Sequence, residues 1–209
     1  MKYPLNSYQT LVFDFDGVIL DSDEFKIETF LSLFTAFPEA LAEIDDYNRK
    51  NRSISRYVKF EYIFKNILKL PYDERVEREI GERYGLLLAK SLTEMPLISG
   101  VKDFLAQQQV PLFIASTAVP EEIKNVVEAK SIGGFFTDIY AYPTSKAAAL
   151  TDVIAKLRLQ MDQVLFFGDA IADFKTARDM GVDFIAVNKR PEIFPQGTRT
   201  IANFLELLS

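Results

Sequence analysis

The order of strand-like and helical stretches limits the possible folds of this chain more than any other feature. After Pro96, short apolar runs typical of buried strands alternate with stretches of helical periodicity. The strand-like runs lie at residues 111–115, 135–142, 164–167 and 184–187, and the helical stretches at 100–109, 120–130, 146–157, 173–180 and 201–208. Such alternation predicts a parallel, Rossmann-like sheet with helices on both faces, the last helix closing the chain.

One long block interrupts this alternation. The apolar run at residues 11–13 predicts the first strand, but residues 23–92 show helical patterns only, joined by short turns that contain proline. A chain of 209 residues is long enough for one ordinary core and a smaller appended unit. We therefore predict an α/β core domain from residues 1–20 and 94–209, with an inserted all-helical cap domain at residues 21–93.

Composition excludes several kinds of active site. The sequence has no His and no Cys, which rules out a Ser-His-Asp triad, a thiol nucleophile and a His/Cys zinc site within this chain. A metal would have to be a hard cation bound by oxygen atoms, and Mg²⁺ is the first candidate. A nucleophile would have to be a carboxylate, a hydroxyl or an amine.

Charge and hydropathy restrict the partners and the location. The net charge of −6 argues against a nucleic-acid partner, which usually requires a basic surface. No apolar run approaches the roughly 20 residues of a membrane span, and the first ten residues do not resemble a signal peptide. We therefore expect no membrane partner and a cytoplasmic location, with the chain acting as a monomer or a small homo-oligomer.

Polar residues follow three of the predicted strands. Asp14 and Asp16 come after the first strand, Ser116 and Thr117 after the second, and Asp169 after Gly168. Ligands of open α/β sheets bind at the carboxyl ends of the strands, so these side chains should lie at one edge. Paired acids beside apolar residues repel each other and lose hydration, and a bound cation would relieve both costs.

Two more residues complete a set that suits phosphate chemistry. Lys146 opens one predicted helix, and Asp173 lies at the start of another. Acids with a hard cation can orient a phosphate, a lysine can offset its charge, and hydroxyl and backbone N–H groups can bind its oxygens. A carboxylate can also attack phosphorus and form an aspartyl phosphate. Simpler explanations for single members are a helix cap at Asp173 and a turn at Ser116 or Thr117.

The combined pattern resembles the haloacid dehalogenase superfamily, in its phosphatase branch with a helical cap, where phosphoglycolate phosphatases and β-phosphoglucomutase-like enzymes belong. Four motifs carry the resemblance, in order along the chain: Phe13-Asp14-Phe15-Asp16-Gly17-Val18, Ile114-Ala115-Ser116, Lys146 at a helix start, and Gly168-Asp169-Ala170-Ile171-Ala172-Asp173. The segment Pro96-Leu97-Ile98-Ser99-Gly100-Val101 resembles the family's return from its cap.

The resemblance implies a role for each motif. Asp14 would be the nucleophile, and Asp16 would be the general acid and then the base. The phosphoryl group would bind to Ser116, with Thr117 beside it and backbone N–H groups near Gly17. Lys146 would pair with Asp14 and a phosphate oxygen. Mg²⁺ would be bound by Asp14, the backbone carbonyl of Asp16 and Asp169. Asp173 would be a metal ligand through water or a partner of Lys146.

The implied activity is a magnesium-dependent phosphatase that acts on a small phosphorylated metabolite. Two alternatives stay open: a sugar phosphomutase of the same family, and a non-catalytic phosphate-binding regulatory protein. The second Asp, Asp16, favours phosphoryl transfer over dehalogenation. Mutases of this family usually have a His after the first motif, where this chain has Lys26, which favours the phosphatase.

Substrate specificity is expected in the cap. The segment from Arg52 to Lys59 contains two arginines and a lysine, and Arg binds carboxylate and phosphate groups through paired hydrogen bonds. We predict that Arg56 or Lys59 binds a second anionic or polar group of the substrate. The alternative is a solvated basic face.

Overall fold

The computed structural model describes residues 3–52, 54–188 and 190–208 and divides the chain into two compact units. We call Met1–Asp21 with Met95–Ser209 the core unit, and Ser22–Glu94 the helical unit. Within the described ranges, every helix is too short or too polar to cross a membrane.

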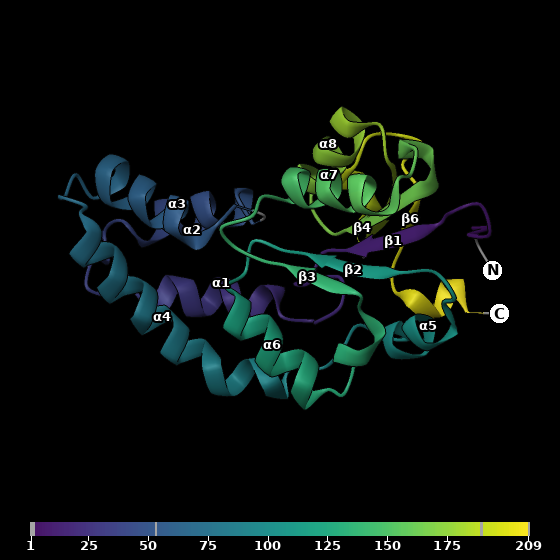
Figure 1. Cartoon of the computed structure of the whole chain (residues 1–209). Helices are drawn as coiled ribbons and strands as arrows, with labels where there is room; N and C mark the ends of the chain where they lie inside the picture. The colour runs from purple at the N-terminus through teal and green to yellow at the C-terminus, as the bar shows by residue number, and fades with distance from the viewer. Residues whose placement is uncertain (1–2, 53, 189, 209) are drawn as a thin grey trace. The chain divides into compact units, whose positions relative to one another are not determined.

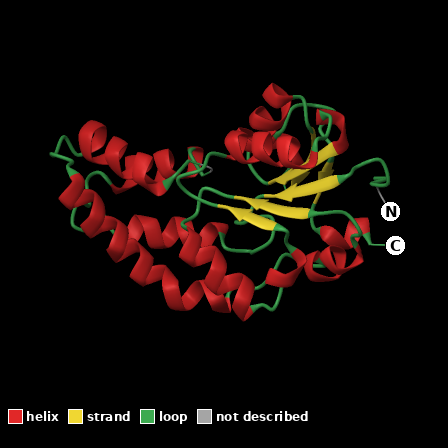
Figure 2. Ribbon diagram, viewed as in Figure 1, coloured by secondary structure: helices red, strands yellow, loops and turns green. Residues whose placement is uncertain are grey.

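The core unit is built on a six-stranded parallel sheet with the strand order β3-β2-β1-β4-β5-β6. Figure 2 shows the strands in yellow, with helices on both sides. The predicted parallel sheet is therefore confirmed, and the first strand lies inside it between β2 and β4. The strands are β1 (Thr10–Phe13), β2 (Leu112–Ala115), β3 (Asp138–Tyr140), β4 (Val164–Gly168), β5 (Asp183–Val187) and β6 (Thr200–Ile201).

Helices cover both faces of this sheet. Figure 1 shows α7 and α8 on one face and α5 and α6 on the other. Their bounds are α5 (Val101–Gln107), α6 (Pro120–Ala129), α7 (Lys146–Leu157) and α8 (Ile171–Met180). Short 3₁₀ turns join some of the elements: η2 (Gly133–Phe135), η3 (Met161–Gln163), η4 (Pro191–Ile193) and η5 (Phe204–Leu207).

Alternate residues of β1 serve the two faces, as the two-residue period of a strand requires. Val12 belongs to the aliphatic cluster that includes Val153 of α7 and Ala177 of α8. Phe13 points to the other face, where its ring stacks on Phe167 with 4.9 Å between centroids. Because both faces of β1 are packed, the strand holds the backbone of the next residue, Asp14, in place.

The helix expected over residues 201–208 is wrong. The chain forms the short strand β6 and then the 3₁₀ turn η5. The side chain of Asn203 accepts a hydrogen bond from the Leu205 N–H at 3.0 Å, which starts the tight turn. Phe204 and Leu207, three residues apart, are both buried, and a three-residue spacing suits a 3₁₀ turn as well as an α-helix.

The helical unit contains α1 (Asp23–Ser32), α2 (Leu41–Lys50), α3 (Arg56–Tyr62), the π-helical turn η1 (Ile63–Ile67) and α4 (Glu74–Glu94). Three aromatic rings form its centre. Phe30 and Phe60 stack at 5.0 Å, and Tyr84 meets Phe30 edge-on at 5.6 Å. These side chains come from α1, α3 and α4, so they join helices that are distant in the sequence.

The chain leaves and re-enters the core unit through two paired segments. The Asp21 N–H donates to the Pro96 carbonyl, and the Ile98 N–H donates to the Ile19 carbonyl, both at 2.9 Å. An antiparallel bridge joins Leu20 to Leu97 between them. The insertion therefore begins and ends at one place in the core unit.

Candidate active site

The ends of three neighbouring strands place the first group of polar side chains. Asp14 follows β1, and its N–H donates to the Phe167 carbonyl of β4 at 2.8 Å, which extends the ladder by one residue. Asp169 follows β4, and Ser116 follows β2. All three side chains are buried. The sequence-predicted edge therefore exists, with Asp14 on the strand between the other two.

Lys146 joins two of the acids. Its ammonium lies 2.7 Å from Asp14 Oδ2 and 2.5 Å from Asp173 Oδ1. Lys146 is the first residue of α7, which begins where the Ser145 hydroxyl accepts the Ala148 N–H. Removing one member of a buried ion pair leaves an unbalanced charge, so these three side chains act as one electrostatic group.

Burial and charge shift the acidity of this group. Loss of hydration raises the pKa of the Asp14 carboxyl to about 7, the Lys146 ammonium opposes that rise, and the charges of Asp173 and Asp16 add to it. Burial by itself lowers the pKa of the Lys146 ammonium, but Asp14 and Asp173 outweigh burial and raise it above its usual range. Lys146 therefore stays charged beside Asp14.

Asp173 has two structural partners. One oxygen accepts from Lys146, and the other accepts from the Ala170 N–H at 3.2 Å, at the start of α8. The Asp173 carboxylate thus caps the start of α8 and also pairs with Lys146, two roles that the sequence suggested. Gly168 allows this arrangement, because a Cβ there would lie 2.4 Å from the Asp173 Cβ.

Gly17 fixes the turn between Asp16 and Leu20. Its φ is +74°, a backbone conformation that residues with a side chain rarely adopt. Its N–H donates to the Leu20 carbonyl at 2.9 Å. A Cβ at this position would lie 2.7 Å from the Asp169 carboxyl carbon. The first and fourth motifs therefore touch at a point where only a hydrogen fits.

The acids form a group that suits a hard cation. Asp14, Asp169 and Asp173 each offer a carboxylate oxygen, and these atoms lie within 4.8 Å of one another. Three buried carboxylates exceed the single charge of Lys146, and their oxygens are the ligands that Mg²⁺ prefers. The donor set therefore fits Mg²⁺. The side chain of Asp16 is outside this group, and its expected metal contact is through the backbone carbonyl.

The phosphate-binding residues predicted after β2 differ in burial. Ser116 is buried, its hydroxyl accepts from the Ala118 N–H at 3.1 Å, and its own N–H donates to the Tyr140 carbonyl at 2.9 Å. Accepting one bond leaves the O–H proton of Ser116 able to donate. Thr117 is half-buried.

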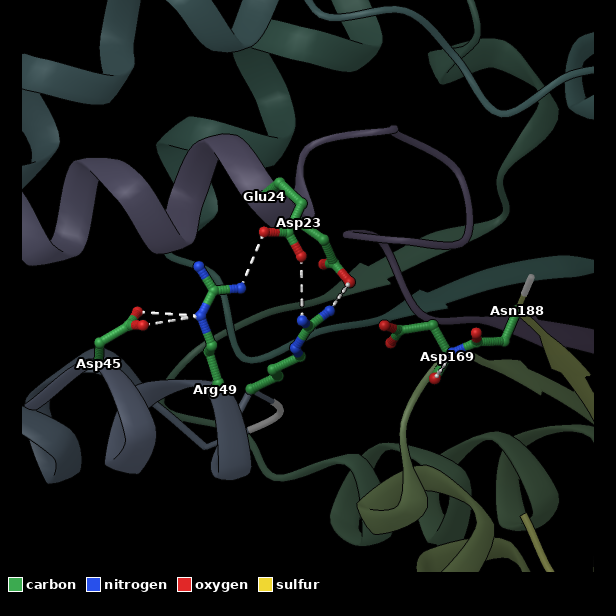
Figure 3. Close-up of polar contacts among 7 residues, drawn as sticks. Asp23, Glu24, Asp45, Arg49, Asp169 and Asn188 are labelled. Carbon is green, nitrogen blue, oxygen red and sulfur yellow. Dashed lines mark hydrogen bonds and ion pairs between the residues drawn. The ribbon is translucent and has the colours of Figure 1, made fainter. Parts of the chain in front are cut away.

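Sequence reasoning missed Asn188. This residue follows β5, and its side-chain amide donates to the Asp169 backbone carbonyl at 2.8 Å (Figure 3). The Asn188 Oδ1 accepts the Arg190 N–H, which fixes the amide orientation. Asn188 thus holds the Asp169 loop through its main chain. Its position after a fourth strand was the available signal.

The helical unit contains the other predicted substrate-binding residues, Arg56 and Lys59. Both lie on α3 and are largely buried. The Arg56 guanidinium lies over the Tyr84 ring at 4.6 Å, and the Lys59 ammonium lies over the Phe30 ring at 4.7 Å. The alternative of a solvated basic face is therefore wrong for these two side chains, and their contact with substrate stays a prediction.

Comparison with known proteins identifies the family. A model of the haloacid dehalogenase-like hydrolases matches residues 11–187. The chain belongs to this family. The match extends from the first strand through β5 and includes every residue of the acid group, which confirms the resemblance found in the motifs.

A curated relative and two solved structures are also similar to this chain. The chain is 25% identical over 189 residues to a phosphoglycolate phosphatase from Synechococcus elongatus, covering 86% of this chain and 83% of that protein. The fold is similar to that of the HAD-hydrolase YfnB from Bacillus subtilis, bound to magnesium (23% identity, 96% of both chains, TM-score 0.69). It is also similar to CbbY from Rhodobacter sphaeroides in complex with phosphate (17% identity, 96% of both chains, TM-score 0.72). The predicted enzyme class, a phosphoric monoester hydrolase, agrees with these findings.

Proposed function

We propose that this hydrolase is a magnesium-dependent phosphatase that cleaves a small phosphomonoester through an aspartyl phosphate on Asp14. The observation that carries the proposal is the buried contact of Asp14 with Lys146, within a group of three acids. Asp14 lies at the end of a strand, and Lys146 holds its carboxylate in place. The other two acids leave negative charge that can bind a cation together with a phosphate. This arrangement suits nucleophilic attack by Asp14 on phosphorus.

The first chemical step uses Asp14 and Asp16. One oxygen of Asp14 forms a bond to phosphorus while the bond from phosphorus to the leaving oxygen breaks. Asp16 donates its proton to that oxygen, so the leaving oxygen departs as a neutral hydroxyl group. Lys146 keeps Asp14 oriented, and the Phe15 N–H, which donates to Asp14 Oδ1 at 2.7 Å, holds the carboxylate from the other side.

The second step returns the enzyme to its starting state. Asp16, now ionised, takes a proton from water as the water oxygen bonds to phosphorus. The bond between phosphorus and Asp14 breaks, and inorganic phosphate leaves. The Ser116 hydroxyl and the N–H groups beside Gly17 would donate to the phosphoryl oxygens.

The metal would be held by Asp14 and Asp169, with the Asp16 carbonyl. Asp173 would bind it through a water molecule or serve as the partner of Lys146. When bound, Mg²⁺ supplies positive charge that screens the phosphate from the attacking carboxylate. Asn188 keeps the Asp169 loop in place for this role.

For the substrate, we propose a two- or three-carbon phosphomonoester that carries an acidic group, with phosphoglycolate as the first candidate. The name of the cyanobacterial relative supports this choice. The helical unit would act as the cap, with Arg56 or Lys59 contacting the second group of the substrate. The cytoplasmic location, the oligomeric state and the absence of a nucleic-acid partner stay predictions.

The experiment measures phosphate release from p-nitrophenyl phosphate and phosphoglycolate, with Mg²⁺ and with EDTA. We expect turnover that requires the metal and is lost in Asp14→Asn. Turnover that ignores EDTA and persists in Asp14→Asn would contradict the proposal. A protein that binds phosphate without any turnover would instead match the regulatory alternative.

A further inference from the structure

A hollow of about 520 Å³ lies within the core unit, beside the edge strand β3. One wall is the start of α6, and the other is the end of β3 with the segment after it, residues 139–144. Small-molecule sites in proteins measure about 300–1,000 Å³, so the hollow has the size of a ligand site. Among the described residues that line it, none belongs to the catalytic group proposed above.

The lining of this hollow is largely apolar and aromatic. Two tyrosines, Tyr140 and Tyr142, and two prolines, Pro120 and Pro143, belong to it. The Tyr140 hydroxyl donates to Asp152 of α7, which holds this tyrosine in place. Rings and apolar side chains favour the packing of a further ring. The hollow therefore suits a ligand that contains an aromatic group.

Two opposite charges lie on the α6 wall of the hollow. Glu121 and Lys124 both line it, are exposed and lie three positions apart on the helix, a spacing that places side chains on one face. Within the described part of the chain, neither side chain forms an ion pair or a hydrogen bond. A carboxylate and an ammonium are therefore both available to a ligand.

An aromatic α-amino acid has the complementary groups. Its carboxylate would pair with Lys124, its ammonium would pair with Glu121, and its ring would pack on the apolar lining. An aromatic acid or an aromatic amine would match only one of the two charges. Exposed ion pairs are weak, so we expect a dissociation constant of about 0.1–1 mM.

The β3 wall of the hollow is bonded to the catalytic edge of the sheet. The Tyr140 carbonyl accepts the Ser116 N–H at 2.9 Å, and the Tyr142 N–H donates to the Ala118 carbonyl at 3.0 Å. Lys146 follows Tyr142 by four positions. A ligand on this wall would therefore contact the backbone that positions both Ser116 and Lys146.

We propose that this hollow is an effector site for a free aromatic amino acid, with Lys124 and Glu121 as its charged contacts. The ligand would bind the wall in the arrangement in which Lys146 contacts Asp14, and a ligand favours the conformation that it binds. The effect on the rate rests on the proposed phosphatase function, whereas the binding of the amino acid does not.

Amide NMR spectra of the ¹⁵N-labelled protein, titrated with L-phenylalanine, test the binding. We expect chemical-shift changes centred on residues 120–124 and 139–144. Phenethylamine lacks the carboxylate and phenylpropionate lacks the ammonium, so each should bind about 3- to 10-fold more weakly than L-phenylalanine. Changes centred elsewhere in the protein, or equal affinities for the three compounds, would overturn the site.

One variant tests the charged contact. Lys124→Gln should weaken the binding of L-phenylalanine by about 3- to 10-fold and leave the affinity for phenethylamine unchanged, because that compound has no carboxylate. Lys175→Gln is the matched control, since Lys175 is an exposed lysine of α8, on the opposite face of the sheet (Figure 1). It should change neither affinity. Equal weakening in both variants would reject the role of Lys124.

Phosphate release from p-nitrophenyl phosphate in Mg²⁺ measures the effector role. Saturating L-phenylalanine should raise kcat by about 1.5- to 3-fold, and Lys124→Gln should need more of it for the same rise. Binding at the hollow without a rise in kcat would overturn the effector role. A wild-type protein without phosphatase activity would overturn the proposed function and the effector role with it, and the NMR titration would still decide the binding site.

Discussion

Each unit of this protein buries a lysine, and the two lysines have different partners. In the core unit, Lys146 contacts the carboxylates of Asp14 and Asp173. In the helical unit, Lys59 contacts the neutral amide of Asn48 and the face of Phe30. A buried lysine can therefore balance a group of carboxylates, as Lys146 does, or donate to a neutral amide, as Lys59 does.

The surrounding acids explain the difference. Lys146 belongs to a group in which carboxylates outnumber it three to one, so negative charge is left over for a metal. Lys59 donates to the neutral amide of Asn48, so this pair does not add to the excess of acids. We therefore expect the core unit to respond to Mg²⁺ more strongly than the helical unit.

The largest expected effect is the loss of the nucleophile. Asp14→Asn should lower kcat by about 10³-fold or more, because the attacking oxygen is removed. Steady-state phosphate release measures this effect. Asp21→Asn is a control in the same unit, outside the acid group, and it should keep most of the activity. An Asp14→Asn protein with near wild-type kcat would mean that the acid group serves another purpose.

The two lysines can be compared through stability. Lys146→Met leaves Asp14 and Asp173 buried without their cation and should lower the free energy of unfolding by about 3–5 kcal/mol. Lys59→Met keeps the contact with Phe30 but removes the donor to the Asn48 amide oxygen. It should lower the free energy of unfolding by about 1–3 kcal/mol. Urea unfolding in EDTA measures both.

Added Mg²⁺ should then recover part of the loss in Lys146→Met and none of the loss in Lys59→Met. Lys156 lies on the same helix as Lys146 and forms an exposed pair with Asp138 of β3. Lys156→Met is therefore a surface control and should lower the free energy of unfolding by about 0–1 kcal/mol. Equal costs for all three variants would show that the buried pair has no special role.

Two glycines give opposite predictions in the two units. Gly17→Ala forces a side chain into a positive φ and against Asp169. This should lower the free energy of unfolding by about 1–3 kcal/mol and weaken the binding of Mg²⁺. Gly85→Ala lies in α4, where a Cβ meets no atom within 4 Å, and should stabilise by about 0.5–1 kcal/mol. Thermal unfolding of both variants checks the signs.

The smallest effect concerns surface charge in the helical unit. A hydrogen bond from Arg49 lowers the pKa of Glu24, with burial opposing it (Figure 3). A lowered pKa adds stability at neutral pH, and this stability is lost as the pH falls through that pKa. Arg49→Ala should therefore cost under about 1 kcal/mol at pH 7. The difference should shrink in acid, and a difference that grows in acid would contradict this assignment.

The sequence predicted the parts of the fold that depend on local pattern. Residues 11–13, 164–167 and 184–187 are apolar throughout because both faces of a central parallel strand are packed, and the strands form there. The closing helix failed because Phe204 and Leu207 have a spacing that fits both an α-helix and a 3₁₀ turn.

The site was predictable only in part. Asp14, Asp169 and Lys146 follow strands or open helices, so the chain order places them at one edge. Asn188 was missed because its position after a strand was its one signal, and a neutral amide does not by itself indicate a catalytic or metal site. The partners of Lys59 were also unpredictable, because Asn48 lies 11 positions away on another helix.

Chemical trapping of the phosphorylated enzyme examines the role of Asp14 at the level of one atom. The enzyme is mixed with phosphoglycolate and Mg²⁺, quenched and treated with borohydride, which reduces an aspartyl phosphate to homoserine. Mass spectrometry of the digest should find homoserine at position 14, and Asp at positions 16, 169 and 173. Turnover with unmodified Asp14, or homoserine at another of these positions, would contradict the proposed mechanism.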